Sequence, residues 1–465
     1  MLEKMSLIEG LLIFFAIILI YFLIIYILHK KEVLKKYNIS LYGPALLLRT
    51  KKGVGFLKKI ASTKRFWKKY GNFGIAFCFI SMVIMVVVLI WQAWAVIGFT
   101  PAQKQAMPGF EVALILPGIN PILPLEYLGF IVIALIVAIV AHEFSHGILT
   151  FVANLKVKSL GVLYLIVPIG AFCEPDEEEL KKTETGKRMR VYAAGPLSNF
   201  VVALIAILLM SFAFMSWVQP SAEGIGVLEV YENSPAANIG IKTGAILTEL
   251  NGTDFSNFES FQQRYIKYIE IMNNTKANET ISVSYIYNHI SYNKTIKLAN
   301  RYDYFPIESN KDKGFTGVYS LIGVEENLNI LKNPIIERFP YGFLFFYVLP
   351  LTGYFEGYNP IVSPFTESYV ITGPLGVFPP IIFWAVVNTL YWIFWLNLAV
   401  GLFNVLPMIP LDGGFLFNDA LKSLVNRIKK DAPEEKRNKI VKNVSLVISL
   451  IILVAIIFPF FIKYI

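Results

Sequence analysis

Long apolar stretches alternate with polar segments along this chain of 465 residues. A helix needs about 20 apolar residues to cross a bilayer, and six stretches reach that length. They are Leu7–Leu28, Phe73–Ile97, Leu128–Phe151, Val191–Val218, Pro379–Phe403 and Val444–Ile462. The first has no basic start and no small-residue cleavage pattern, so we interpret it as a retained helix. The pattern predicts an α-helical polytopic membrane protein with about six transmembrane helices.

Three other apolar stretches are too short or too broken to cross. Irregular backbone at membrane depth needs protein or water as a partner. Residues 116–123 and Tyr341–Leu351 are therefore expected to be surface or re-entrant segments. Val157–Cys173 is rich in β-branched residues and is interrupted by Gly and Pro. That pattern predicts a short sheet or hairpin at the membrane boundary.

Residues 222–298 change to short alternating runs around a turn-rich middle, which predicts a small α/β module. GIGV at 224–227, followed by SPAANIGIKTGAILTELNG at 234–252, resembles a PDZ domain. The resemblance implies a module that captures a peptide C-terminus or an extended segment by strand addition. The implied contact residues are Gly224, Ile225, Gly226 and Val227. A spacer domain that binds nothing is the alternative.

Composition excludes several classes of protein. Hydrophobic residues make up 55% of the chain and charged residues 16%, whereas soluble domains carry about 25% charged residues. A soluble enzyme, a disordered chain and a fibrous repeat are thereby excluded. The 42 Lys and Arg outnumber the 33 Asp and Glu, and thirteen of these basic residues fall within residues 30–72. Because cytoplasmic loops are enriched in Lys and Arg, the excess indicates membrane topology and not nucleic-acid binding.

The basic loops also predict an orientation. Residues 30–72, 181–190 and 415–442 all face the cytoplasm if six spans alternate from an outside N-terminus. We therefore expect a multi-pass protein of the cell membrane with its PDZ-like domain outside the cytoplasm.

The sequence also predicts how the chain divides into parts. They are the first helix and basic loop at 1–72, the first part of the membrane core at 73–218, the PDZ-like domain at 219–300, a connector at 301–378, and the second part of the core at 379–465.

The segment AHEFSH at 141–146 places two of the four histidines four residues apart. Positions i and i+4 share one face of a helix, so His142 and His146 can reach a single metal ion. Neutral imidazole suits zinc. Glu143 lies one step around the helix and can accept a proton from water that the metal activates.

The setting of this motif strengthens the metal interpretation. It lies within an apolar span, where one ionisable residue costs about 2.5–3.5 kcal/mol on insertion scales. A bound metal would compensate for two histidines and a glutamate at this depth. The alternative is a group of buried polar residues that joins helices by hydrogen bonds.

A catalytic zinc site takes three protein ligands and keeps one position open. The two cysteines lie in apolar surroundings, and His29 and His289 fall in loops assigned to opposite sides. Asp412 fits best, because it follows the fifth span at its cytoplasmic end. His142 and His146 lie near the cytoplasmic end of the third span, so depth and side agree. An N-cap role is the alternative for Asp412.

Several motifs in order resemble the site-2 protease family of intramembrane zinc metalloproteases. They are AHEFSHG at 141–147, AGPLSN at 194–199, the inserted PDZ-like module, and NVLPMIPLDGG at 404–414. PGIN at 117–120 is similar to the branch that cleaves membrane-bound transcription factors. The Lys-, Ile- and Asn-rich usage favours an archaeal member.

The resemblance implies one Zn2+ per chain, held by His142, His146 and Asp412, with Glu143 as the general base. It also implies residues near the site at Asn199 and Asn404. We expect these two to hold the substrate or the oxyanion, with helix–helix hydrogen bonding as the alternative.

The activity that the resemblance implies is regulated intramembrane proteolysis. A peptide bond would be hydrolysed in or near the transmembrane helix of a membrane-protein substrate, and Val157–Cys173 could pair with the unwound segment. A catalytically silent adaptor that uses the PDZ-like module is one alternative. A transporter is another, but the chain shows no internal repeat.

Overall fold

The computed structural model describes residues 7–36, 39–42, 45–107, 109–113, 120–165, 167–334 and 341–462, with the side chains of the first helix from residue 19 on. It forms two compact units. The first unit comprises Met1–Phe110, Leu135–Val202 and Leu396–Ile465, and the second comprises Glu111–Ala134 and Ala203–Trp395. Of the predicted PGIN loop at 117–120, all but Asn120 lies outside the described residues.

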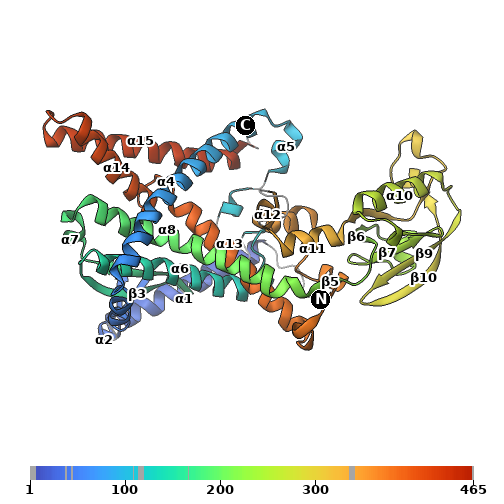
Figure 1. Cartoon of the computed structure of the whole chain (residues 1–465), viewed down its shortest axis with the longest axis horizontal. Helices are drawn as coiled ribbons and strands as arrows, with labels where there is room; N and C mark the ends of the chain where they lie inside the picture. The colour runs from blue at the N-terminus through green and yellow to red at the C-terminus, as the bar shows by residue number, and fades with distance from the viewer. Residues whose placement is uncertain are drawn as a thin grey trace. The chain divides into compact units, whose positions relative to one another are not determined.

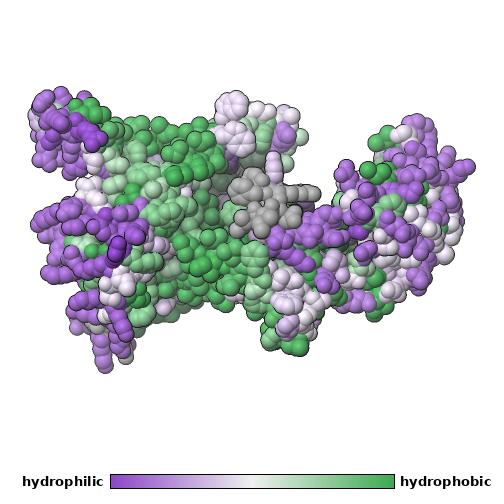
Figure 2. Space-filling model, viewed as in Figure 1, coloured by the Kyte–Doolittle hydropathy of each residue, from purple (hydrophilic) through white to green (hydrophobic). Residues whose placement is uncertain are grey.

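Among the described residues, five helices are long and apolar enough to cross a membrane. They are built on α4 (Lys64–Ala95), α6 (Leu128–Val152), α8 (Thr185–Leu208), α13 (Pro380–Asn404) and α15 (Glu434–Phe461). Their large apolar side chains stay uncovered: Val83, Ile136 and Leu450 are 47–62% exposed. Hydrophobic residues cover the surface of these helices (Figure 2). Such a surface suits lipid and not water, and the predicted polytopic helical fold is confirmed.

These five helices coincide with five of the six predicted spans. The remaining one, Leu7–Leu28, lies within α1 (Leu7–Lys30). The apolar segment at Tyr341–Leu351 forms part of α12 (Tyr341–Glu356). At 16 residues, α12 is shorter than the about 20 residues that a crossing needs.

The hairpin predicted at Val157–Cys173 is present. β3 (Val157–Leu165) and β4 (Val167–Pro175) pair antiparallel. The basic segment before α4 adds β1 (Ile39–Tyr42) and β2 (Ala45–Thr50), which gives one sheet in the order β1-β2-β3-β4. β4 is therefore an edge strand of this sheet among the described residues.

A buried cluster joins this sheet to the helices that carry the predicted zinc motifs. It contains Leu57 of α3 (Val54–Ile60), Leu149 of α6, Cys173 of β4 and Ala194 of α8. All four are at most 7% exposed. Apolar burial thus fixes α6, α8 and β4 against one another, which positions the polar residues that these elements carry.

The first unit closes with a helical hairpin. α14 (Asp412–Ile428) and α15 pack side by side, and α15 also packs along α4 (Figure 1). Two glycines let α14 begin close to the preceding loop. A Cβ at Gly414 would lie 2.5 Å from the carbonyl carbon of Met408, and one at Gly413 would collide with the carbonyl group of Val405. Asp412 is thereby held at the first turn of α14.

The second unit contains the predicted α/β module. Its main sheet runs β10 (Ile290–Lys297), β9 (Thr280–Tyr287), β7 (Ile246–Leu250), β6 (Ile225–Val230) and β13 (Val318–Ile322), and β8 (Thr253–Asp254) pairs with β7. α10 (Phe261–Asn274) covers the core, where residues such as Val227, Leu247 and Val283 are at most 1% exposed. β13 lies beyond the predicted boundary at residue 300, because the chain returns to the sheet after a loop.

Candidate metal centre

His142 and His146 lie one turn apart on α6 and point to the same side. Their Nε2 atoms are 3.1 Å apart. Both side chains are only 12–13% exposed. The helical spacing therefore produces the paired imidazoles that the sequence predicts.

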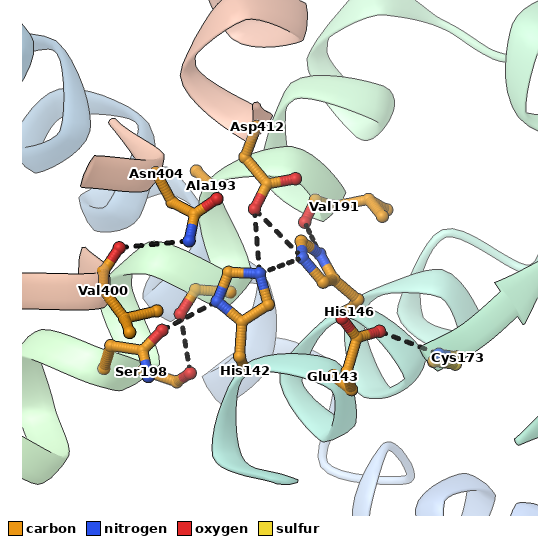
Figure 3. Close-up of polar contacts among 12 residues, drawn as sticks. His142, Glu143, His146, Cys173, Val191, Ala193, Ser198, Val400, Asn404 and Asp412 are labelled. Carbon is orange, nitrogen blue, oxygen red and sulfur yellow. Dashed lines mark hydrogen bonds and ion pairs between the residues drawn. The ribbon is translucent and has the colours of Figure 1, made fainter. Parts of the chain in front are cut away.

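Asp412 completes the group from a distant part of the chain. Its Oδ2 lies 3.0 Å from His142 Nε2 and 3.2 Å from His146 Nε2 (Figure 3). The three side chains form a cluster of possible metal ligands among the described residues. Helix α14, which begins at Asp412, brings the carboxylate to the two rings.

These residues fit a zinc ion in both chemistry and spacing. Zinc ligands lie about 2.0–2.2 Å from the metal in a tetrahedral site, which separates two ligand atoms by about 3.3 Å. The observed separations of 3.0, 3.1 and 3.2 Å agree with that geometry. Two imidazoles and one carboxylate leave one tetrahedral position for substrate or water.

The outer nitrogens of both rings face oxygen acceptors. His142 Nδ1 lies 2.7 Å from Asn199 Oδ1, and His146 Nδ1 lies 2.8 Å from the carbonyl oxygen of Val191. An oxygen acceptor requires the proton on Nδ1. The lone pair of each Nε2 is then directed toward Asp412, where a metal can accept it.

Asn199 is fully buried and both of its amide hydrogens are used. Its Nδ2 donates to the carbonyl oxygen of Ala138 and to Asn397 Oδ1, each at 3.0 Å. The amide oxygen must therefore face His142. Asn199 thus joins α8 to α6 and α13 through hydrogen bonds.

Asn404 has a different set of contacts. Its Nδ2 donates to the carbonyl oxygen of Val400 at 3.0 Å, within the last turn of α13 (Figure 3). Its side chain is half-buried. The second amide hydrogen has no partner among the described residues, so it is available to a ligand. The two asparagines that the sequence treats alike therefore differ in their free donors.

Glu143 is held by the neighbouring sheet. The backbone N–H of Cys173 in β4 donates to Glu143 Oε2 at 2.8 Å. Burial, and to a smaller extent the Glu143 carboxylate, raises the pKa of the Cys173 thiol to about 12. Burial therefore favours the neutral form of this thiol.

Gly195 is a site residue that sequence reasoning missed. A Cβ at this position would lie 2.6 Å from His142 Nε2 and would collide with His146 Nε2. Only hydrogen fits between α8 and the two rings. Gly195 lies four residues before Asn199, on the same face of α8, and that spacing is the signal that could have identified it.

A second missed feature is the ion pair between Arg188 and Asp419. Arg188 Nε donates to Asp419 Oδ2 at 2.6 Å, and its Nη2 donates to Oδ1 at 2.7 Å. This two-pronged contact joins the start of α8 to α14, seven residues beyond Asp412. No sequence spacing relates residues 231 positions apart, so the pair was not predicted.

The prediction for peptide contact at Gly224–Val227 is wrong about its position. Gly226–Val230 of β6 pair with β13, and Ile225 and Gly226 pair with β7. A peptide strand cannot add to a strand whose two edges are already paired. The edge beside this position belongs to β13 among the described residues.

A groove does lie beside β13. Its cavity of about 360 Å3 is lined by one face of α10, including Tyr265 and Ile269, and by β13 residues including Tyr319 and Ser320. Aromatic side chains such as Phe305 border it. An exposed strand edge next to a mainly apolar helix face has the form of a site for an extended peptide.

Comparison with known proteins finds a matching family, sequence relatives and a solved domain. The family described as peptidase family M50 matches residues 130–452. An uncharacterized protein of Methanocaldococcus jannaschii is 26% identical over 418 residues, which are 89% of this chain and 86% of that protein. The zinc metalloprotease RasP of Shouchella clausii is 24% identical over 255 residues, which are 54% of each chain. The PDZ domain of an SdrC-like protein from Listeria monocytogenes matches with 22% identity and a TM-score of 0.17, covering 22% of this chain and 90% of that domain.

Proposed function

Since the chain belongs to peptidase family M50, we propose that it is a zinc metalloendopeptidase that cleaves within the membrane. Its substrates would be membrane proteins, cut at a peptide bond in or near a transmembrane helix, as in regulated intramembrane proteolysis. One observation carries the proposal. His142 and His146 lie on a helix that is long and apolar enough to cross a membrane, and Asp412 meets them at zinc-ligand spacing.

One Zn2+ held by these three residues would supply Lewis-acid chemistry, which would polarise a carbonyl and make water more acidic. Glu143 is the proposed general base. It takes the proton of the attacking water and later passes it to the leaving amine. The N–H of Cys173 fixes the direction of the carboxylate but occupies only one of its oxygens. The other oxygen remains for proton transfer.

The two asparagines are proposed to act differently. Asn199 orients His142, because its oxygen accepts from Nδ1 and its hydrogens are used elsewhere. Asn404 keeps one amide hydrogen, and it is the proposed donor to the oxyanion or substrate. An oxyanion donor contributes about 3–4 kcal/mol to the transition state.

The edge strand β4 is proposed to receive the substrate. A transmembrane helix hides its carbonyls in i to i−4 hydrogen bonds, so the substrate must unwind before it is cut. An unwound segment could pair with β4, which also holds Glu143 through Cys173. A proline scan of residues 170–174 that left cleavage intact would contradict this pairing.

The groove between α10 and β13 is proposed to hold an extended segment or C-terminus of a partner protein. Its wall of tyrosine and phenylalanine favours apolar side chains. An acidic substitution at Ile269, which lines the groove, should weaken binding of an apolar peptide in a fluorescence titration. The same substitution at Ile266, on the outer face of α10, should leave binding unchanged.

The protein is a multi-pass membrane protein, and its orientation is part of the proposal. The basic loops at 30–72, 181–190 and 415–442 favour a zinc site near the cytoplasmic side of the cell membrane. The PDZ-like module would then lie outside the cytoplasm. Accessibility of single cysteines introduced at exposed positions of the module to an impermeant thiol reagent, in intact cells, tests this orientation.

Zinc content and cleavage test the enzymatic proposal together. We expect about one zinc per purified chain and cleavage of a model transmembrane substrate. Glu143→Gln should keep the zinc and abolish cleavage, because the amide cannot accept the proton. The alternative function, an adaptor that uses its PDZ-like module, predicts unchanged behaviour in this variant. Zinc-free protein after reconstitution with zinc salts would overturn the proposal.

A further inference from the structure

A cavity of about 480 Å3 lies between α14 and α15. None of the three proposed zinc ligands lines it. On α15 the lining side chains repeat at helical spacing, and they include Asn438, Lys442 and Ser445. Asn418 and Lys422 face them from α14, one turn apart. The cavity is thus a cleft between two antiparallel helices that are joined by a short basic loop.

The polar lining of this cavity offers donors. Lys422 is half-buried, and neither it nor Lys442 has an ion-pair partner among the described residues. No Asp or Glu lines the cavity. Ser445 Oγ donates to Asn418 Oδ1 at 3.1 Å, and the Asn418 amide hydrogens have no hydrogen-bond partner in the part of the chain that the structure describes. Two lysines and one amide group therefore line the cavity, with no carboxylate among the described residues that line it.

The rest of the lining is apolar, and the cavity lies where polar surface changes to apolar surface. Val441 and Leu446 line it next to the lysines. Farther along α15, Val447 and Leu450 are 54% and 52% exposed. Figure 2 shows hydrophilic surface at the tip of the α14–α15 hairpin and hydrophobic surface over the following part of α15. The lysines therefore lie at headgroup depth if α15 crosses the membrane.

We propose that this cavity binds an anionic phospholipid, with its phosphate between Lys422 and Lys442 and an acyl chain along Val441 and Leu446. Charge complementarity favours this occupant. A substrate helix would bring no negative charge to the two lysines, and a free phosphate would leave the apolar lining uncovered. Basic pockets between transmembrane helices bind lipid headgroups by this combination of charge and apolar contact.

The proposed lipid would also adjoin the loop that ends at Asp412. Ile409 lines the same cavity, and its N–H donates to Ser449 Oγ on α15 at 3.4 Å. A lipid that fills the cleft would hold α14, α15 and this loop together. Bound lipid should therefore raise the thermal stability of the protein.

The test measures binding of phosphatidylglycerol to the purified full-length chain in phosphatidylcholine discs, by native mass spectrometry. We expect preferential binding of the anionic lipid. Lys422→Gln and Lys442→Gln should each weaken it about fivefold, and the double variant about 25-fold. Replacing both lysines by arginine should preserve binding, because the charges remain. Lys439→Gln is the matched control, since Lys439 lies on α15, is exposed and does not line the cavity.

Several outcomes would overturn the proposal. Equal binding of phosphatidylglycerol and phosphatidylcholine would remove the charge argument. An equal loss in Lys439→Gln would show a diffuse surface effect instead of a site. Competition by inorganic phosphate at millimolar concentration would assign the lysines to a free anion. Displacement of the lipid by a transmembrane peptide would assign the cleft to a substrate helix.

Discussion

The carboxylate of Glu143 accepts a 2.8 Å hydrogen bond from the backbone N–H of Cys173. Glu143 lies on α6, the helix that carries His142 and His146, and Cys173 lies on the edge strand β4. The group proposed to move the proton is therefore oriented by the strand proposed to receive the substrate. A shift of β4 would therefore move the Glu143 carboxylate relative to His142 and His146.

Gly147 tests this link, because it lies where α6 packs against β4. A Cβ there would lie 2.9 Å from Cys173 Sγ and 2.8 Å from Leu57 Cδ1, so neighbouring groups must move. We expect Gly147→Ala to keep zinc and to lower kcat at least tenfold, since misplacement of a catalytic group by about 1 Å can cost a hundredfold. Cleavage kinetics and zinc content give the answer.

The matched control for that variant is Gly129→Ala on the same helix. No other group lies within 4 Å of a Cβ at Gly129. Alanine is favoured over glycine inside a helix, so this change should preserve both activity and stability. Equal kcat in the two variants would argue against any role of the contact between Glu143 and Cys173.

Gly195→Ala should abolish zinc binding. The new methyl group would collide with His146 Nε2 and lie 2.6 Å from His142 Nε2, the atoms proposed to bind the metal. We expect zinc content to fall below one tenth of the wild-type value and cleavage to be lost with it. Gly186→Ala, on the same helix in open surroundings, is the control and should keep the metal. A fully metallated Gly195→Ala protein would contradict the proposed ligand geometry.

The alanine variants of Asn199 and Asn404 should differ in the quantity that each one changes. Loss of the Asn199 oxygen frees the His142 ring to rotate, and loss of such an orienting partner typically lowers metal affinity 10–100-fold. Asn404→Ala should keep zinc affinity and lower kcat, because it removes a donor to the reacting oxygen. Competition with a fluorescent chelator measures the first effect, and steady-state cleavage measures the second. Identical profiles for both variants would contradict the division of roles.

The sequence predicts best those features that depend on a single helix or a single apolar stretch. His142 and His146 need only helical spacing, and the apolar spans need only length. Asp412 follows from two arguments: a catalytic zinc site takes a third protein ligand, and this residue is expected at the same membrane depth as the histidines. Its approach to the histidines, at 3.0 and 3.2 Å, agrees with that reasoning.

The features that sequence reasoning missed depend on how distant segments pack. β1 and β2 lie in a segment whose dense positive charge indicates a loop. They form strands because β2 pairs with the free edge of β3, and β1 then pairs with β2. β13 takes the open edge of β6 because the chain, after β10 ends at Lys297, returns to this side of the sheet at Val318. Local pattern cannot show which strand takes an open edge, so the peptide site was assigned to the strand nearest the recognised motif.

The ion pair between Arg188 and Asp419 should position Asp412. Its two side chains are 12% and 8% exposed, and it joins α14 to the turn of α8 that precedes Val191, the acceptor of the His146 proton. Arg188→Met leaves a buried carboxylate unpaired, which should lower the free energy of unfolding by about 3–5 kcal/mol. The double variant Arg188→Met/Asp419→Leu removes both charges and should recover most of that stability.

Zinc affinity distinguishes positioning from simple stabilisation in this double variant. Without the two parallel hydrogen bonds, α14 can slide relative to α8, and Asp412 then moves relative to the histidines. We expect the double variant to bind zinc about tenfold more weakly than wild type although its stability is nearly restored. Lys187→Met, which breaks the solvent-accessible pair between Lys187 of α8 and Glu184 just before this helix, should change neither quantity. Unfolding curves and zinc titrations in the same detergent provide both measurements. If the double variant binds zinc as tightly as wild type, the ion pair stabilises the fold but does not position Asp412.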